Sequence, residues 1–143
     1  MDTFKCDEKT MQLFCKQFYT DKGYAHAERV ANFAREDIRY WQEKDRDFVM
    51  CLAWAHDLYE DTNCPHEIFT PDFDKALHFI TWYNKETTYD RYLELIKKGR
   101  DTSHVGHMVW WVKLLDMKDH LTQTDTLTDK LKEKYLSGLR YLL

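Results

Sequence analysis

Apolar residues recur along this chain three and four positions apart, which is the spacing of one face of an α-helix. Met11, Phe14 and Phe18 in the first segment are an example. The pattern predicts seven helices, at about residues 8–19, 24–44, 46–62, 72–83, 89–98, 103–121 and 128–142. Asp45 suits the N-cap of the third helix, and Gly99 is expected to close the fifth.

Few residues in this chain break helices. It has only four glycines and two prolines, and its runs of β-branched residues are short. Its 143 residues fall within the usual size of one domain, and a hydrophobic fraction of 43% is enough to form a core. We find no repeat, low-complexity tract or linker. The sequence therefore predicts an all-α protein that forms a single compact domain over residues 1–143.

The third predicted helix ends in a group of ionisable residues. An apolar run over residues 48–55 leads directly into His56 and Asp57, which are followed by Glu60 and Asp61. If the helix continues, these four side chains crowd one wall at the end of a core helix. Carboxylates this close repel one another and are costly to move towards a core unless a positive charge offsets them. A divalent metal ion would supply that charge, whereas a solvated acidic helix end is the simpler alternative.

Two further polar residues lie on apolar stripes. His26 precedes Val30 on the inner side of the second predicted helix, where a hydrogen-bonded core histidine is one interpretation. Asp116 follows Val112 by four positions in the sixth helix, and an aspartate is almost never buried without a partner. Lys113 is one candidate partner, although lysine–aspartate pairs on a helix usually face solvent.

A shared metal ion accounts for these residues together. Two imidazoles and two carboxylates, from His26, His56, Asp57 and Asp116, would form a four-ligand site with open positions for water. Such a mixed set of nitrogen and oxygen ligands suits manganese, zinc or iron.

Composition excludes several other classes of protein. The net charge is −4 with acids and bases mixed, which argues against an extended nucleic-acid partner. No segment approaches about 18 uncharged apolar residues, and residues 1–5 do not resemble a signal peptide, so we expect no membrane segment and a cytoplasmic location. The four cysteines form no Cys-x-x-Cys pair, which indicates reduced thiols. The oligomeric state stays open, and a homo-oligomer is compatible with the sequence.

The same residues resemble a known family. An early His, an adjacent His-Asp pair about thirty residues later and a late Asp after an apolar run resemble the signature of the HD-domain metal-dependent phosphohydrolases. Residues 56–62, His-Asp-Leu-Tyr-Glu-Asp-Thr, are similar to the His-Asp-x-x-Glu-Asp-Thr motif of the RelA/SpoT-type hydrolase domain and of small stand-alone (p)ppGpp hydrolases. Residues 112–116, Val-Lys-Leu-Leu-Asp, resemble the segment that carries the last metal ligand of that family, and residues 23–26, Gly-Tyr-Ala-His, the segment around the first. The resemblance spans about residues 23–121.

The resemblance implies an HD-domain fold and a role for each matched residue. His26, His56, Asp57 and Asp116 would bind the metal, usually manganese in this family, and Glu60 and Asp61 would orient and deprotonate the attacking water. The implied reaction is removal of the 3′-pyrophosphate from guanosine tetra- or pentaphosphate. Three residues near the motifs are candidates for substrate contacts: Tyr24, Arg29 and Lys113.

The chain also departs from the family pattern. The relatives carry an arginine shortly before the first His that packs on the guanine base, but residues 18–22 here are Phe-Tyr-Thr-Asp-Lys. His120 takes the place of an asparagine that follows the last metal ligand in the relatives. These departures leave the recognition of the base open. Three alternatives to the implied reaction remain: a nucleotidase or phosphodiesterase acting on another nucleotide, a non-catalytic nucleotide-binding regulatory module, and a helical protein-interaction domain.

Overall fold

A computed structural model describes residues 7–143 of the chain, and this part contains helices and no strands. The prediction of an all-α fold with six to seven helices is confirmed, since seven helices have ten or more residues. These are α1 (Glu8–Phe18), α2 (Asp21–Glu36), α3 (Glu43–Ala55), α5 (Pro71–Ile80), α6 (Tyr89–Thr102), α7 (His104–Thr122) and α8 (Asp129–Leu142). A 3₁₀ turn, η1 (Ile38–Tyr40), and the short α4 (Leu58–Asp61) complete the described elements.

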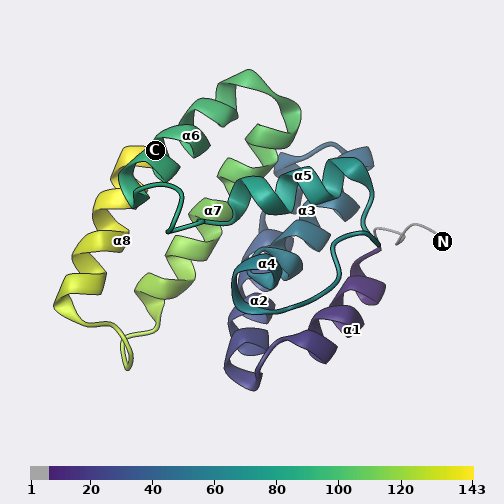
Figure 1. Ribbon diagram of the computed structural model, residues 1–143, viewed down its shortest axis with the longest axis horizontal. Helices are drawn as coiled ribbons and strands as arrows, with labels where there is room; N and C mark the ends of the chain where they lie inside the picture. The colour runs from purple at the N-terminus through teal and green to yellow at the C-terminus, as the bar shows by residue number, and fades with distance from the viewer. Residues whose placement is uncertain (1–6) are drawn as a thin grey trace.

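Helix α7 organises the fold. It runs through the middle of the molecule, with α6 and α8 on one side and α1 to α5 on the other (Figure 1), and it contacts α2, α3, α5, α6 and α8. Helix α3 is buried over the whole run Val49–Ala55 because α1, α2, α5 and α7 cover it. The buried apolar residues form a core cluster to which most of the helices contribute.

The second helix is shorter than predicted. Helix α2 ends at Glu36, and the predicted extension to Lys44 is wrong, because the chain turns through η1 and places Trp41 in the core. The N-cap of α3 is therefore Gln42. Asp45, the predicted N-cap, lies in the first turn of α3 and pairs with a histidine of α7.

A second departure from prediction lies where α6 and α7 come close together. Gly99 does not close α6, which continues to Thr102. Instead, the backbone of Gly99 lies against Gly106 of α7, where an added Cβ would come within 2.2 Å of the Gly99 carbonyl oxygen. The missing side chain of Gly106 therefore allows the two helix backbones to come close together, which fixes the position of the helix that carries Asp116.

The third predicted helix is interrupted at His56 and Asp57. Helix α3 ends at Ala55, His56 caps it, and Asp57 leaves helical geometry with φ −99° and ψ 2° before α4 begins. Successive residues of a regular helix point about 100° apart. The interruption lets the neighbouring side chains of His56 and Asp57 reach the same point.

The cysteines agree with the sequence analysis where they are described. Cys15 and Cys64 are buried free thiols, Cys51 is buried in the core, and Cys6 lies outside the described residues. None of the helices within residues 7–143 combines the length and the apolar character that crossing a bilayer requires.

Candidate metal centre

The fold brings His26, His56, Asp57 and Asp116 together. His26 comes from α2, His56 and Asp57 from the junction of α3 and α4, and Asp116 from α7. His26 Nε2 lies 2.8 Å from Asp116 Oδ1, 3.2 Å from His56 Nε2 and 3.4 Å from Asp57 Oδ2. His56 Nε2 lies 3.2 Å from Asp116 Oδ1 and 3.3 Å from Asp57 Oδ2. Four potential ligand atoms from distant parts of the chain thus surround one point.

These separations match the edges of a coordination polyhedron. Ligands bound at about 2.1 Å lie about 3.0 Å apart in an octahedron and about 3.4 Å apart in a tetrahedron. The five separations given above run from 2.8 to 3.4 Å. This His/Asp group could therefore hold a metal ion with little movement of its side chains.

Hydrogen bonds behind the two imidazoles orient them for this role. His56 Nδ1 lies 2.7 Å from the carbonyl oxygen of Ala53, and because a carbonyl only accepts, Nδ1 carries the proton. His26 Nδ1 donates to Asp119 Oδ2 at 2.6 Å. In both neutral rings the lone pair is then on Nε2 and points at the shared centre, which is the arrangement that metal-bound histidines adopt.

Protons stabilise the same cluster when no cation is bound. Burial lowers the pKa of His26, but hydrogen bonds to Asp116 and Asp119 outweigh burial and raise that pKa to about 9. Burial likewise opposes ionisation of His56, while the charge of Asp57 and a hydrogen bond to Asp116 raise the pKa of His56 well above its ordinary value. The proton on an imidazole Nε2 and a metal ion would therefore compete for the same position between these side chains.

We therefore expect the affinity for a divalent ion such as Mn²⁺ to rise as the pH rises from about 6 to about 9, because the ion displaces protons from the imidazoles. The raised pKa of His26 also stabilises the metal-free fold below the ordinary pKa of histidine, and this contribution is lost as the pH rises through about 9. Titration calorimetry in buffers of different ionisation enthalpy measures the protons released. Metal binding without proton release would contradict this competition.

Asp119 was not predicted from the sequence. It is fully buried, accepts a hydrogen bond from His26, and also accepts from Arg29 Nε at 2.8 Å. Asp119 follows Asp116 by three positions, so it points to the same side of α7. Arg29, which the sequence predicts to contact substrate, donates to the carboxylate behind His26 and is not among the residues that line the cavity beside the cluster.

Lys113 pairs with Asp116 inside the protein. Lys113 Nζ lies 2.8 Å from Asp116 Oδ2, and the two side chains are only 13% and 5% exposed. The expectation that such a pair faces solvent is therefore wrong, because α7 is covered on most sides. The pair occupies one oxygen of Asp116 and leaves Oδ1 facing the histidines. Burial raises the pKa of Asp116, but Lys113 and three imidazoles outweigh burial and hold this pKa well below its ordinary value.

A cavity of about 200 Å³, which we call the central cavity, opens beside the His/Asp cluster. Its walls combine carboxylates, lysines, imidazoles and aromatic rings: His56, Asp57, Glu60, Asp61, Ile80, Trp82, Tyr89, Lys113, Asp116, His120, Lys134 and Tyr135. Burial and the charge of Asp57 raise the pKa of Glu60 and that of Asp61, so both carboxylates hold a proton more readily than usual.

Three of the residues predicted from the sequence, Glu60, Asp61 and Lys113, lie in the wall of this cavity. Tyr24 is not: its hydroxyl accepts from Gln12 and its ring packs against Trp54.

Helix α8 supplies residues that the sequence did not reveal. Lys134 Nζ lies 4.4 Å from the ring centre of Tyr89 and 5.3 Å from that of Trp82. The ring of Tyr135 stacks on that of His120 with centres 4.6 Å apart, and the His120 ring stacks on that of His26. Only contacts made in three dimensions connect α8 with the metal ligands, so no spacing within the sequence could indicate them.

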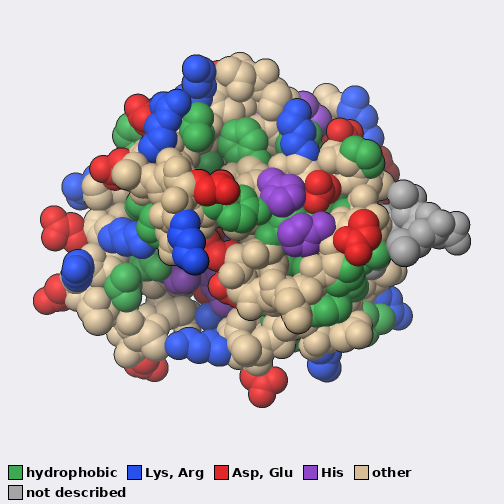
Figure 2. Space-filling view, viewed as in Figure 1, with side chains coloured by type: hydrophobic (Ala, Val, Ile, Leu, Met, Phe, Trp, Pro, Cys, Tyr) green, Lys and Arg blue, Asp and Glu red, His purple; other side chains and the backbone are tan. Residues whose placement is uncertain are grey.

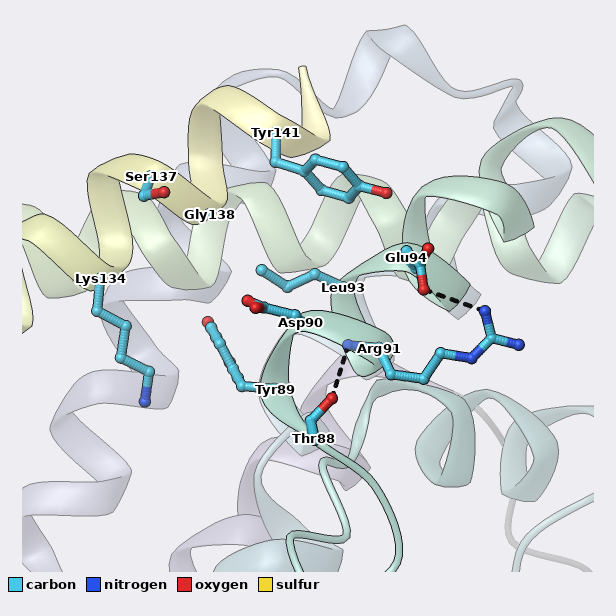
Figure 3. Close-up of a pocket in the computed structure, with 10 residues that line it drawn as sticks. All are labelled: Thr88, Tyr89, Asp90, Arg91, Leu93, Glu94, Lys134, Ser137, Gly138 and Tyr141. Carbon is cyan, nitrogen blue, oxygen red and sulfur yellow. Dashed lines mark hydrogen bonds and ion pairs between the residues drawn. The ribbon is translucent and has the colours of Figure 1, made fainter.

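Two larger cavities adjoin the first. One of about 610 Å³ shares Glu60, Asp61, Trp82 and Lys134 with it. The other, of about 540 Å³, lies between α6 and α8 and shares Tyr89 and Lys134. Figure 3 shows Lys134 and Tyr89 at one end of that cavity and the Arg91–Glu94 ion pair at the other. A ligand larger than the central cavity can therefore extend past Lys134.

Comparison with known proteins gives no independent assignment. No protein-family model matches the chain, and no curated protein matches it.

Proposed function

We propose that this protein is a metal-dependent phosphohydrolase of the HD-domain type that cleaves a nucleotide phosphate ester, in the manner of a (p)ppGpp 3′-pyrophosphohydrolase. One observation carries the proposal: two imidazole nitrogens and two carboxylate oxygens converge at the wall of a cavity that also holds two acidic and two basic side chains. Manganese is the metal that the family resemblance favours, and zinc and iron suit the same ligands.

The residues around the central cavity can take different roles in hydrolysis. A bound divalent ion supplies Lewis acidity towards a water molecule and towards the phosphate oxygens. Glu60 and Asp61 can accept the proton of the attacking water, because their raised pKa values bring them closer to neutral pH. Lys113 and Lys134 place positive charge where phosphate oxygens gather negative charge during the reaction.

Tyr89 supports a polar ligand in this cavity. Its hydroxyl is buried and, among the described residues, has no hydrogen-bond partner. Buried polar groups nearly always have a partner, and each exception calls for an explanation. A phosphate oxygen bound between Tyr89 and Lys134 would accept this missing hydrogen bond.

The adjoining cavities suit the rest of a nucleotide. Pockets that bind small molecules usually measure about 300–1,000 Å³, which is more than the central cavity offers. The neighbouring space of about 610 Å³ is lined by Trp82 and Tyr83, whose rings can stack on a base. We place the phosphate beside the His/Asp cluster and the nucleoside next to Trp82.

Guanine preference is expected to be weaker than in the family. Stacking of an arginine on a base contributes about 0.5–2 kcal/mol, which corresponds to at most about thirtyfold in affinity, and this chain lacks that arginine. Tyr19, in the corresponding segment, is buried and donates its hydroxyl hydrogen to the Trp54 carbonyl. We therefore expect ppGpp and its adenine analogue to differ only modestly in kcat/KM.

The test is a panel of ppGpp, its adenine analogue and ordinary nucleoside mono- and triphosphates, assayed with Mn²⁺. Metal-dependent release of phosphate or pyrophosphate from one of these compounds supports the proposal. If metal-loaded protein turns over none of them, the hydrolase assignment fails and a binding module replaces it. A preference for ppGpp of about a thousandfold, or about 4 kcal/mol, would contradict only the prediction of weak base selectivity.

A further inference from the structure

A second group of metal-ligating side chains lies on the outer surface. Histidine side chains gather over α5 on the face shown in Figure 2. His66, from the loop before α5, and Asp74 and His78, from α5, each offer one potential ligand atom, and these atoms lie within 4.8 Å of one another. None of the three belongs to the cluster around Asp116.

The spacing within α5 fits a tetrahedral ion. Asp74 and His78 are one turn apart and point to the same side. His78 Nε2 lies 3.5 Å from Asp74 Oδ1, which is long for a hydrogen bond and close to the ligand spacing of about 3.4 Å around a tetrahedral zinc ion. The side chains are 45% and 36% exposed, so an ion can enter from solvent without opening the fold.

Neighbouring tyrosines hold these potential ligands in place. His78 Nδ1 lies 2.5 Å from the hydroxyl of Tyr83, an outer hydrogen bond of the kind that metal-bound histidines use. The hydroxyl of Tyr59 donates to Asp74 Oδ1 at 2.6 Å, and a carboxylate has enough lone pairs to bind a cation as well. The ring of His66 stacks on that of Tyr59 with centres 3.6 Å apart. All three side chains are therefore positioned before any ion binds.

We propose that His66, Asp74 and His78 form a Zn²⁺ site with one open position for water. Two imidazoles and one carboxylate are a well-established ligand set for zinc. The ion would tie the loop at residues 62–70 to α5. Because Tyr59 contacts both His66 and Asp74 and precedes Glu60 in α4, zinc would also restrict the segment that carries Glu60 and Asp61. The site does not depend on the proposed hydrolase function.

Equilibrium dialysis against Zn²⁺ tests the site, with zinc bound per chain as the readout. The His56→Ala variant serves as the background, because its inner cluster lacks one imidazole. We expect this variant to retain one zinc ion, and His56→Ala/His66→Ala and His56→Ala/His78→Ala to lose it. His56→Ala/His104→Ala is the matched control, since His104 is an exposed histidine outside the site and its removal should leave the bound zinc unchanged.

Two results would overturn the proposal. One is a His56→Ala protein that binds no zinc although its circular dichroism spectrum shows it folded. The other is zinc binding that is unchanged by both the His66 and the His78 substitutions. A second readout follows the imidazole resonances of His66 and His78 by NMR during a zinc titration of the wild-type protein, where we expect both to shift together. Neither readout requires hydrolase activity, so the proposed function and the zinc site can fail separately.

Discussion

Replacing Asp57 with alanine is expected to remove the bound metal and the hydrolase activity together. Asp57 Oδ2 lies within 3.4 Å of both imidazole Nε2 atoms, so the substitution deletes one of the four ligand atoms. Even the outer partners of metal ligands contribute about 10–100-fold to affinity or activity. We therefore expect the affinity of Asp57→Ala for Mn²⁺ to fall by more than about a hundredfold and kcat/KM to fall at least as far.

The control for this variant is Asp125→Ala, which removes an exposed aspartate from the turn between α7 and α8. Metal content is measured after dialysis, alongside turnover and the circular dichroism spectrum. An Asp57→Ala protein that is folded and keeps its metal would show that Asp57 is not a ligand. Loss of activity with retained metal would assign Asp57 to a step other than metal binding.

Replacing Glu60 with glutamine is expected to separate metal binding from turnover. Glutamine keeps the shape of the side chain but cannot accept the proton from water. Glu60 lines the central cavity and is outside the group of four converging ligand atoms. Metal affinity should therefore stay near the wild-type value, while kcat falls by about 10²–10⁴-fold, the usual contribution of a general base.

Glu28→Gln is the matched control for this experiment, because Glu28 is exposed on α2. Single-turnover rates with saturating Mn²⁺ give the comparison. If Glu60→Gln retains near-wild-type turnover, Glu60 is not the proton acceptor and Asp61, in the same cavity wall, takes that role. If Glu60→Gln also loses its metal, the separation of ligands from catalytic acids is wrong.

Helical periodicity was enough to predict the all-α fold, because long amphipathic segments carry their own signal. It failed where burial of a single side chain overrides periodicity. Trp41 enters the core and α2 ends eight residues early, and Gly99 lies inside α6 against Gly106 of α7 instead of ending the helix. These two outcomes depend on which helices meet, and local spacing contains no such information.

The candidate site was likewise predictable only in part. His26 and Asp116 were recognisable because a polar residue on an apolar stripe requires a partner. Asp119 and Lys134 were not recognisable, since their partners His26 and Tyr89 lie 93 and 45 positions away in the sequence. Lys113 was recognised as a possible partner of Asp116, but the sequence did not indicate that the packing of α7 buries this pair.

We propose that one divalent ion binds among His26, His56, Asp57 and Asp116. The most direct test is an anomalous difference map from crystals grown with Mn²⁺, recorded at the manganese absorption edge. We predict one peak about 2.0–2.3 Å from both Nε2 atoms and from an oxygen of each carboxylate. A map with no peak at this point, from crystals saturated with Mn²⁺ at a pH above about 8, would contradict the claim.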